Sequence, residues 1–332
     1  MDNAMRISVV ISSHDRPEGV RALLSDLVAQ ELSTDASMEI VVVDSAGVDC
    51  ARGACAEFAS ERVPVRHVSG PNKLAAKRNA GAAVAQGGIL VFLDDDMRIG
   101  PRFIGAHLEA QQHRPGVLSS DIQFPESWVL SSNYYRYKNR HHVNGVSNEH
   151  RVPLAGNRFV AMAFSMRSAH FNQVGGFDED FQRYGGEDIE FGYRALRAGF
   201  LNEHLPTAVA VHEEVDMDID VYARKVYRAS YHGMPMVVAK APEARSVRII
   251  KLTDPTVDRG PVARIVRVGS RTANLLRAEK AVRWVLRSTD SHRHLYFPVL
   301  YDLVVLMATQ AAVDDRRAGR RDRSASAQSD GF

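Results

Sequence analysis

Apolar runs and helical stretches alternate along the first part of the chain. Runs typical of buried strands occupy residues 7–11, 39–43, 65–68 and 89–93, and helical periodicity occupies residues 17–31, 49–60 and 73–86. This alternation predicts a parallel sheet with right-handed crossovers. Because the carboxyl ends of parallel strands meet at one edge of the sheet, polar residues that follow these strands can face one ligand.

The middle of the chain has a less regular pattern. A helix is expected at residues 101–114, strands at 117–124, 159–166 and 208–211, and a further helix from near Glu187 to Gly199. Residues 125–158 lack periodicity and contain many aromatic and basic side chains, among them Trp128, Tyr134, Tyr135, Tyr137, His141 and His142. Long irregular segments are usually functional loops or disordered. We expect this segment to bind a substrate by ring stacking; a surface loop with a few buried anchors is the alternative.

The C-terminal part is basic and amphipathic. Arginine or lysine stands at positions 264, 267, 271, 277, 280, 283 and 287 between apolar residues. The apolar run at 296–313 contains Pro298 and Asp302 and is short for a membrane span, so a packed helix is expected. Interfacial binding of the basic helices to a membrane is a further expectation. The tail at 316–332 has few apolar residues and is expected to be disordered.

Composition narrows the class of protein. A chain of 332 residues with 45% hydrophobic content can bury one large core or two modest ones. The net charge of +2 gives no electrostatic reason to expect a nucleic-acid partner. The first residues lack the apolar region of a secretory signal, so a cytoplasmic protein, peripheral at a membrane surface if the basic helices bind one, is expected.

Three consecutive carboxylates, Asp94, Asp95 and Asp96, directly follow the apolar run at 89–93. Adjacent acids repel one another unless a cation or donor groups neutralise them. Oxygen ligands on a short turn suit Mg²⁺ or Mn²⁺, which would then bind substrate phosphates. A solvated acidic turn after a strand is the alternative.

Several motifs occur in a fixed order along the chain. SSHD follows the first strand, Asp44 follows the second, and KLAAKRNAG precedes the strand with the three acids; GGFDEDFQRYGGEDIEFGYRALRAG and a strand ending at His212 come later. In this order the chain, over roughly residues 5–215, resembles a family 2 glycosyltransferase of the GT-A fold. The GGED module is similar to that of galactosyltransferases and chondroitin-polymerase-type enzymes. The resemblance implies an α/β fold with a mostly parallel central sheet flanked by helices. The remainder of the chain is unmatched, and its amphipathic pattern predicts a helical C-terminal extension.

The resemblance also implies a division of the chain. Residues 1–100 would form the nucleotide-sugar-binding half of the GT-A domain, and 101–240 its acceptor-binding and catalytic half. Residues 241–315 would be the helical extension, followed by the tail at 316–332. Acceptor specificity would then belong to the aromatic segment at 125–158.

The resemblance assigns residues to the nucleotide. Ser12 and His14 would line the nucleobase pocket, and Asp44 would accept a hydrogen bond from the base; helix capping is the alternative for Asp44. Arg78 would approach the base, ribose or diphosphate, with a solvated helix arginine as the alternative. Either Asp94 or Asp95 would contact the ribose.

A metal site is implied next to the nucleotide. Asp96 matches the metal-binding acid of the DxD motif, and Asp94 is a further candidate ligand. His212 matches the position from which some relatives supply another ligand, and an imidazole favours Mn²⁺ over Mg²⁺. Glu213 and Glu214 are the alternatives to His212.

Glycosyl transfer with inversion needs a base for the acceptor proton and a cation for the leaving diphosphate. Asp188 fits the base, because the start of a helix favours an ionised carboxylate and the preceding glycines allow close approach of a substrate. Glu187 would bond acceptor hydroxyls or the donor sugar. Two acids that only stabilise a helix N-terminus are the alternative.

The expected activity is transfer of a single sugar, with inversion, from a nucleotide diphosphate sugar, a UDP-sugar, to a hydroxyl group on a glycan or small-molecule acceptor. The QxxRW motif of processive synthases is absent from the sequence, which argues against a polymerising enzyme. A retaining GT-A transferase and a catalytically silent nucleotide-sugar-binding protein are the alternatives. Homo-oligomer formation is left open.

Overall fold

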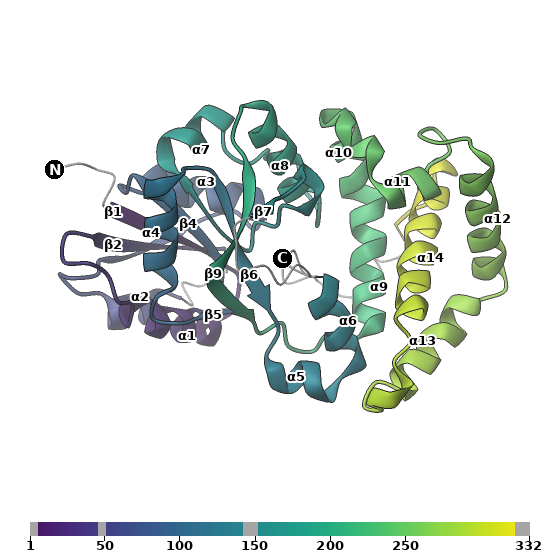
Figure 1. Ribbon diagram of the computed structural model, residues 1–332, viewed down its shortest axis with the longest axis horizontal. Coiled ribbons are helices and arrows are strands. Elements are labelled where there is room, and N and C mark those ends of the chain that lie inside the picture. The colour runs from purple at the N-terminus through teal and green to yellow at the C-terminus, as the bar shows by residue number, and fades with distance from the viewer. Residues whose placement is uncertain (1–5, 46–50, 142–151, 323–332) are drawn as a thin grey trace.

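The computed structural model describes residues 6–45, 51–141 and 152–322. Its centre is a nine-stranded sheet in the order β3-β2-β1-β4-β8-β6-β9-β5, with β7 paired to β9 (Figure 1). The strands are β1 Arg6–Ser13, β2 Ser37–Asp44, β3 Val65–Ser69, β4 Ile89–Asp94, β5 Met97–Ile99, β6 Val117–Gln123, β7 Val152–Pro153, β8 Ala163–Arg167 and β9 Asn202–His212.

The first four strands confirm the predicted parallel arrangement. β1 pairs in parallel with both β2 and β4, and β2 pairs in parallel with β3. β8 then inserts antiparallel between β4 and β6, while β9 is parallel to β6. Only the short strands β5 and β7 and strand β8 oppose the common direction, so the sheet of the described chain is mostly parallel.

Two apolar cores cover the two faces of the sheet. Helices α1 Pro17–Val28, α2 Arg52–Phe58 and α4 Phe103–His113 pack on one face, and α3 Leu74–Val84, α7 Ser168–Val174 and α8 Glu187–Arg197 pack on the other. Successive side chains of a strand point to opposite faces, so Val9 joins the first core and Val10 the second, each with no exposed surface. Burial of each such side chain contributes about 1.5 to 3 kcal/mol to folding.

Regular structure extends into the segment expected to be irregular. It contains α5 Glu126–Ser131, α6 Asn133–His141 and the 3₁₀-helix η2 Gly156–Arg158, so the prediction of an aperiodic segment is wrong there. Helices this short show too few turns for a periodic signal. Tyr134 and Tyr137 of α6 are each 2% exposed and pack against the C-terminal helices. Residues 142–151, and therefore His142, lie outside the described residues.

A layer of helices lies beside the sheet domain, and α12 is its outermost member (Figure 1). Its elements are α9 Ile219–Arg228, the π-helix η3 Ala229–Gly233, α10 Met234–Lys240, η4 Pro242–Ser246, α11 Arg248–Thr253, α12 Pro261–Leu275, α13 Ala278–Ser288, η5 Arg293–Leu295 and α14 Pro298–Arg317. The layer begins at α9, before residue 241. Asp218 fixes the start of α9, since its side chain accepts hydrogen bonds from the backbone N–H groups of Asp220 and Val221.

The start of the C-terminal tail is ordered, contrary to expectation. Helix α14 continues to Arg317, the hydroxyl of Tyr231 donates to the carbonyl of Arg320 at 2.7 Å, and Nε2 of His232 lies 2.8 Å from Asp322. Residues 323–332 lie outside the described residues. Among the helices of the described chain, including α14, none combines the length and apolar character that crossing a membrane requires.

Candidate active site

Strand register brings the predicted nucleotide-binding residues to one edge of the sheet. Ser12 of β1 lies opposite Asp94 of β4, and Ser13 lies opposite Asp44 of β2. Ser12 is 5% exposed and Asp44 is 2% exposed. Ser12 and Asp94 on one face of the sheet, and Ser13 and Asp44 on the other, therefore lie at its carboxyl edge, where the sequence predicts the ligand.

Asp44 makes a structural contact at this edge. Its Oδ2 accepts a hydrogen bond from the backbone N–H of Ala51 at 3.2 Å, directly before α2, and lies 3.8 Å from Nε2 of His67. The contact with Ala51 matches the capping alternative for Asp44. It uses one carboxylate oxygen, and the role of Asp44 toward a base remains a prediction.

A polar cluster surrounds the loops after β1 and β2. Nδ1 of His14 lies 3.1 Å from Oγ of Ser45, and Nε2 of His14 lies 3.4 Å from the side-chain amide of Asn72. Lys77, which the motif analysis did not select, reaches the same cluster: its Nζ donates to the carbonyl of Ser13 at 2.9 Å and to Oγ of Ser45 at 3.2 Å. Burial lowers the pKa of Lys77.

Arg78 connects the two halves of the site. Its Nη2 donates to Oδ1 of Asp94 at 3.1 Å, and its Nη1 donates to Oε1 of Glu187 at 3.3 Å. Arg78 is 3% exposed, which excludes the solvated helix arginine. One guanidinium therefore links the acidic strand end to the start of α8.

A short strand pair brings Asp96 to His212. β5 pairs antiparallel with β9 with Met97 opposite His212, and the backbone N–H of Glu213 donates to the carbonyl of Asp96 at 2.8 Å. Oδ2 of Asp96 then lies 3.4 Å from Nε2 of His212. The ring of Phe124 stacks on this imidazole with 5.5 Å between ring centroids.

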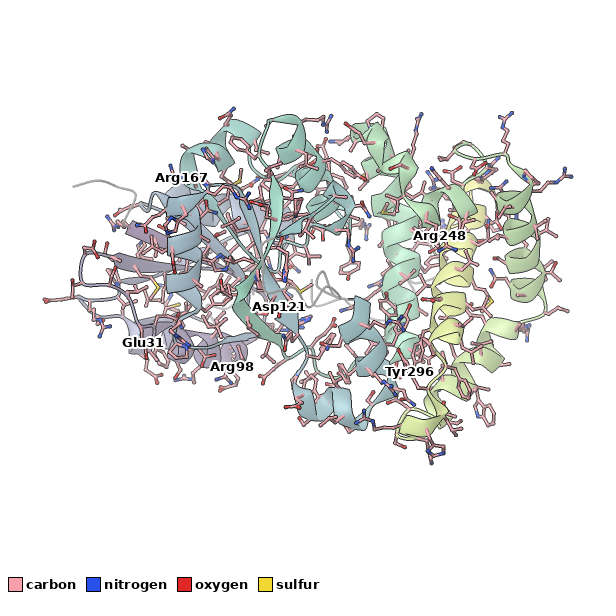
Figure 2. The ribbon with its side chains drawn as sticks, viewed as in Figure 1. Glu31, Arg98, Asp121, Arg167, Arg248 and Tyr296 are labelled. Atoms are coloured by element: carbon pink, nitrogen blue, oxygen red, sulfur yellow. The ribbon has the colours of Figure 1, made fainter. Side chains whose placement is uncertain are left out.

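The alternative acids beside His212 have other surroundings. Glu214 forms an ion pair with Lys225 of α9. The side chain of Glu213 is 44% exposed, and its Oε2 lies 4.0 Å from Nη1 of Arg98, which Figure 2 labels at the β5 end of the sheet. Of the three candidates at this strand end, His212 is the one paired with Asp96.

Arg16 is a second basic residue that motif analysis missed. Its Nη1 lies 2.7 Å from Oδ2 of Asp96 and 3.3 Å from Oδ1 of Asp95. The preceding Asp15 has a φ of 52°, an uncommon conformation for a residue with a side chain, in the turn between β1 and α1. The sequence did contain a signal for the role of Arg16, because Arg16 is a charged residue in the turn directly after the first strand.

The two acids that contact Arg16 differ in protonation. Burial, and next the charge of Asp96, raises the pKa of Asp95 to about 7. Burial also opposes ionisation of Asp96, but contacts with His212 and Arg16 outweigh it and bring the pKa of Asp96 below its usual range. Asp96 is thus the acid of this pair that stays ionised at neutral pH.

The side chains of Asp96 and His212 could serve as ligands of a divalent cation whose remaining ligands come from a substrate. Within the described residues no group of three or more His, Cys, Asp or Glu side chains is arranged as a metal site. Oδ1 of Asp96 is buried and has no hydrogen-bond partner in the described part of the chain. One carboxylate and one imidazole leave positions for phosphate oxygens and water, as Mg²⁺-type sites commonly do.

The GGED sequence forms a sharp turn into α8. Gly185 and Gly186 have φ values of 90° and 105°, a region that side chains disfavour. Asp188 lies in the first helical turn, where we expected the helix field to keep it ionised. Burial, and next the charge of Glu187, outweighs that field and raises the pKa of Asp188 to about 7. A base with its pKa near the working pH is well matched to proton transfer.

The C-terminal helices pack directly against this turn. A Cβ atom built on Gly233 of η3 would lie 1.8 Å from the carbonyl oxygen of Gly185, and one on Gly186 would lie 2.9 Å from Cγ2 of Val237. The π-helical turn η3 occurs at this contact, and such turns are frequent at functional sites. The helical layer therefore supports the backbone of the GGED turn.

The aromatic segment divides into two groups. Tyr134 and Tyr137 are buried anchors, as the alternative for this segment expected. Trp128 and Tyr135 form a ring chain that leads through Phe124 to His212, with centroid distances of 5.0 Å between Trp128 and Tyr135 and 5.1 Å between Tyr135 and Phe124. Phe124 thus connects this second group to the imidazole of His212.

Comparison with known families gives two matches. Glycosyl transferase family 2 matches residues 8–172, and the N-terminal domain of galactosyltransferase matches residues 140–215. The chain is similar to validoxylamine A glucosyltransferase of Streptomyces hygroscopicus subsp. jinggangensis (strain 5008), with 26% identity over 215 residues that make up 57% of this chain and 50% of that protein.

Other similar proteins are longer or more distant. Hyaluronan synthase of Pasteurella multocida is 24% identical over 242 residues, 63% of this chain and 24% of that protein. The chain thus spans half or less of the length of these two curated relatives. The solved mannosyltransferase PcManGT from Pyrobaculum calidifontis, in complex with GDP-Man and Mn²⁺, has a TM-score of 0.63 and 15% identity, covering 95% of this chain and 88% of that one. That likeness establishes the fold.

Proposed function

The chain belongs to glycosyltransferase family 2 and has the GT-A fold, and on that premise we propose that it transfers a single sugar, with inversion, from a UDP-sugar to a hydroxyl group of a glycan or small-molecule acceptor. The observation that supports this most is the double contact of Arg78. Because Asp94 and Glu187 bind the same guanidinium, the donor edge of the sheet and the GGED turn form one site.

The donor would bind along the carboxyl edge of the first strands. Ser12, His14 and Asp44 line the base pocket in this proposal, and Asp94 or Asp95 contacts the ribose. The buried Lys77 bonds both Ser13 at the end of β1 and Ser45 directly after β2, which supports a preformed pocket.

Asp96 and His212 would bind Mn²⁺ or Mg²⁺, with Asp94 as a further candidate ligand. The bound ion would neutralise the charge that develops on the leaving diphosphate. The Oδ1 atom of Asp96, which has no hydrogen-bond partner among the described residues, and the nearby imidazole support this assignment. Arg16, which contacts the other oxygen of Asp96, would supply further positive charge beside the phosphates.

Asp188 would take the proton from the acceptor hydroxyl. Its raised pKa supports this role, because the carboxylate is partly ionised and still basic near pH 7. Glu187, bonded to Arg78, would orient hydroxyl groups of the substrates. Trp128 and Tyr135 would stack on the acceptor beside the metal-binding residues.

A ligand panel tests the donor and the metal together. Thermal stabilisation is measured with UDP-sugars and GDP-mannose, each with and without Mn²⁺; GDP-mannose is included because the solved PcManGT structure contains GDP-Man. We expect a UDP-sugar to raise the melting temperature in the presence of Mn²⁺. A rise with GDP-mannose and none with any UDP-sugar would overturn the proposed uracil nucleobase. Product configuration by NMR separates inversion from retention. Absence of both transfer and donor hydrolysis would favour the silent binding protein.

A further inference from the structure

Helix α12 has its apolar side facing outward. The exposed large apolar residues along it and at its end are Val262 (68% exposed), Ile265 (71%), Val268 (55%), Leu275 (83%) and Leu276 (75%). The buried positions of the same helix are Ala263, Arg267 and Ser270. A surface helix of a globular protein normally turns its apolar stripe toward the core, so this orientation is inverted.

Polar contacts attach α12 to its neighbour. The side-chain amide of Asn274 donates to the carbonyl of Met307 in α14 at 3.1 Å, and Arg271 forms an ion pair with Asp314. The outward residues recur at helical spacing and therefore share one face. We call this set, Val262, Ile265, Val268, Leu275 and Leu276, the outer apolar face.

Basic side chains and a tryptophan are also exposed on α12, on α13 and between the two helices. Arg264, Arg277 and Lys280 are exposed, and within the described residues none of them forms an ion pair. Trp284, one helical turn after Lys280 on α13, is 61% exposed. The other basic residues expected to form a basic surface point elsewhere: Arg267 is buried, and Arg283 and Arg287 pair with Asp220.

We propose that the outer apolar face of α12, with Trp284 of α13, lies against the surface of an anionic lipid bilayer. An apolar helix face flanked by arginine, lysine and tryptophan is the chemistry of a helix that lies in the membrane interface. Contiguous exposed apolar surface marks an interaction site. Helix α12 is the outermost element of the helical layer, so a flat surface can reach it (Figure 1).

Charge argues for lipid over a second copy of the chain. A two-fold contact between copies would place the same surface patch on both sides. Arg264, Arg277 and Lys280 would then face their own counterparts. An anionic headgroup layer instead gives these cations partners, and the acyl region receives the apolar side chains.

Fluorescence of Trp284 provides a direct test. The chain has two tryptophans, so Trp128→Phe leaves Trp284 as the sole reporter. We expect its emission to shift to shorter wavelength on addition of phosphatidylglycerol vesicles, with a smaller shift on neutral phosphatidylcholine vesicles and partial loss in high salt. No shift and no cosedimentation with anionic vesicles at low salt would overturn the proposal.

Paired variants identify the surface that binds. Ile265→Asp with Leu275→Asp should lower partitioning onto anionic vesicles at least tenfold while leaving the melting temperature and transfer to a soluble acceptor unchanged. Leu201→Asp changes a residue that is 51% exposed on the sheet domain and should bind vesicles normally. Equal binding to anionic vesicles by the wild type, the α12 double variant and Leu201→Asp would overturn the proposal. So would light scattering that shows a dimer which only the α12 variant dissociates.

Discussion

Nε2 of His212 lies 3.4 Å from Oδ2 of Asp96, although Asp96 lies in the turn between β4 and β5 and His212 ends β9, far away in the sequence. The antiparallel pairing of β5 with β9 sets this distance, since it places Met97 opposite His212. Phe124 stacks on the imidazole and restricts its orientation. The pairing of β5 with β9 thus holds the turn that carries Asp96 against the end of β9, and strand pairing is a more rigid support for a site than a free loop.

Removal of either member of the pair should change metal dependence. Asp96→Ala should abolish the Mn²⁺-dependent thermal shift with UDP, because it removes the ionised carboxylate that would bind the metal in the proposed site. His212→Ala should weaken the shift with Mn²⁺ more than with Mg²⁺, since imidazole favours Mn²⁺. Calorimetry with each metal measures both effects.

Two comparisons make the metal experiment specific. Glu109→Ala removes an exposed acid from α4 and should leave the thermal shift unchanged. The double variant of Asp96 and His212 should lose no more than Asp96→Ala alone, because residues that serve one ligand are not additive. Unchanged affinity for UDP with Mn²⁺ in Asp96→Ala would contradict the assigned ligand.

Asp44 has a structural contact as well as its proposed role, and two variants separate them. Asp44→Ala should weaken donor binding by roughly 1 to 3 kcal/mol and also destabilise the fold, because the buried N–H of Ala51 loses its acceptor. Asp44→Asn keeps an oxygen for Ala51 but presents N–H groups to the base. It should lose donor affinity at nearly normal stability. Normal donor affinity in Asp44→Asn would exclude the base contact.

The order of elements in the first four strands was predictable because each strand is a continuous apolar run. The strand ends then fixed where Asp44 and Asp94 would lie. Arg16 and Lys77 were not predictable in the same way, because an arginine or lysine near a turn is usually solvated. Arg16 and Lys77 acquire their contacts only because the fold brings the ends of other strands close to their side chains.

The helices of the C-terminal half show a different limit of sequence analysis. Periodicity identifies α12 as amphipathic, but it does not say which side of a helix faces the protein. Only the packing of Asn274 against α14 shows that the polar side is inward. Likewise, Tyr134 and Trp128 are aromatic residues of one segment, and only the structure distinguishes the buried anchor Tyr134 from Trp128, whose ring contacts lead through Tyr135 and Phe124 to His212.

Gly233 should be intolerant of any side chain. In Gly233→Ala the new Cβ would meet the carbonyl oxygen of Gly185, so η3 and the GGED turn would have to separate. We expect a loss of about 1 to 3 kcal/mol in unfolding free energy, measured by urea denaturation. Transfer at saturating substrate should fall more than donor affinity, because the turn that positions Asp188 moves.

A second helical glycine provides the matched control. In the described part of the chain, no atom outside the local backbone of α12 lies within 4 Å of a Cβ built on Gly269. Gly269→Ala should therefore stabilise the protein by about 0.5 to 1 kcal/mol through its helix propensity, with transfer unchanged. Equal stability changes in the two variants would contradict the packing at Gly185.

Arg78 should be essential for both stability and chemistry. Arg78→Met removes the partner of Asp94 and Glu187 at a position that is 3% exposed, so we expect a loss of about 3 to 5 kcal/mol in unfolding free energy. Arg78→Lys keeps the charge but cannot bond both acids in the same fork geometry. It should fold more stably than Arg78→Met and still transfer sugar slowly. Full activity in Arg78→Lys would show that the bridge is dispensable.

Asp188 gives the most direct test of the mechanism. Its pKa is raised to about 7 by burial and then by Glu187, and a base acts only when deprotonated, so transfer at saturating substrate should rise about tenfold per pH unit below 7 and level off above it. Asp188→Asn should bind donor normally, transfer at least ~100-fold more slowly, and lose this pH dependence. Glu187→Gln should instead also weaken substrate affinity, because in the proposed site Glu187 would orient hydroxyl groups of the substrates. The transfer rate of the wild type, Asp188→Asn and Glu187→Gln, measured as a function of pH, distinguishes these outcomes. Near wild-type transfer by Asp188→Asn would refute the proposal that Asp188 is the catalytic base, and it would favour a retaining enzyme.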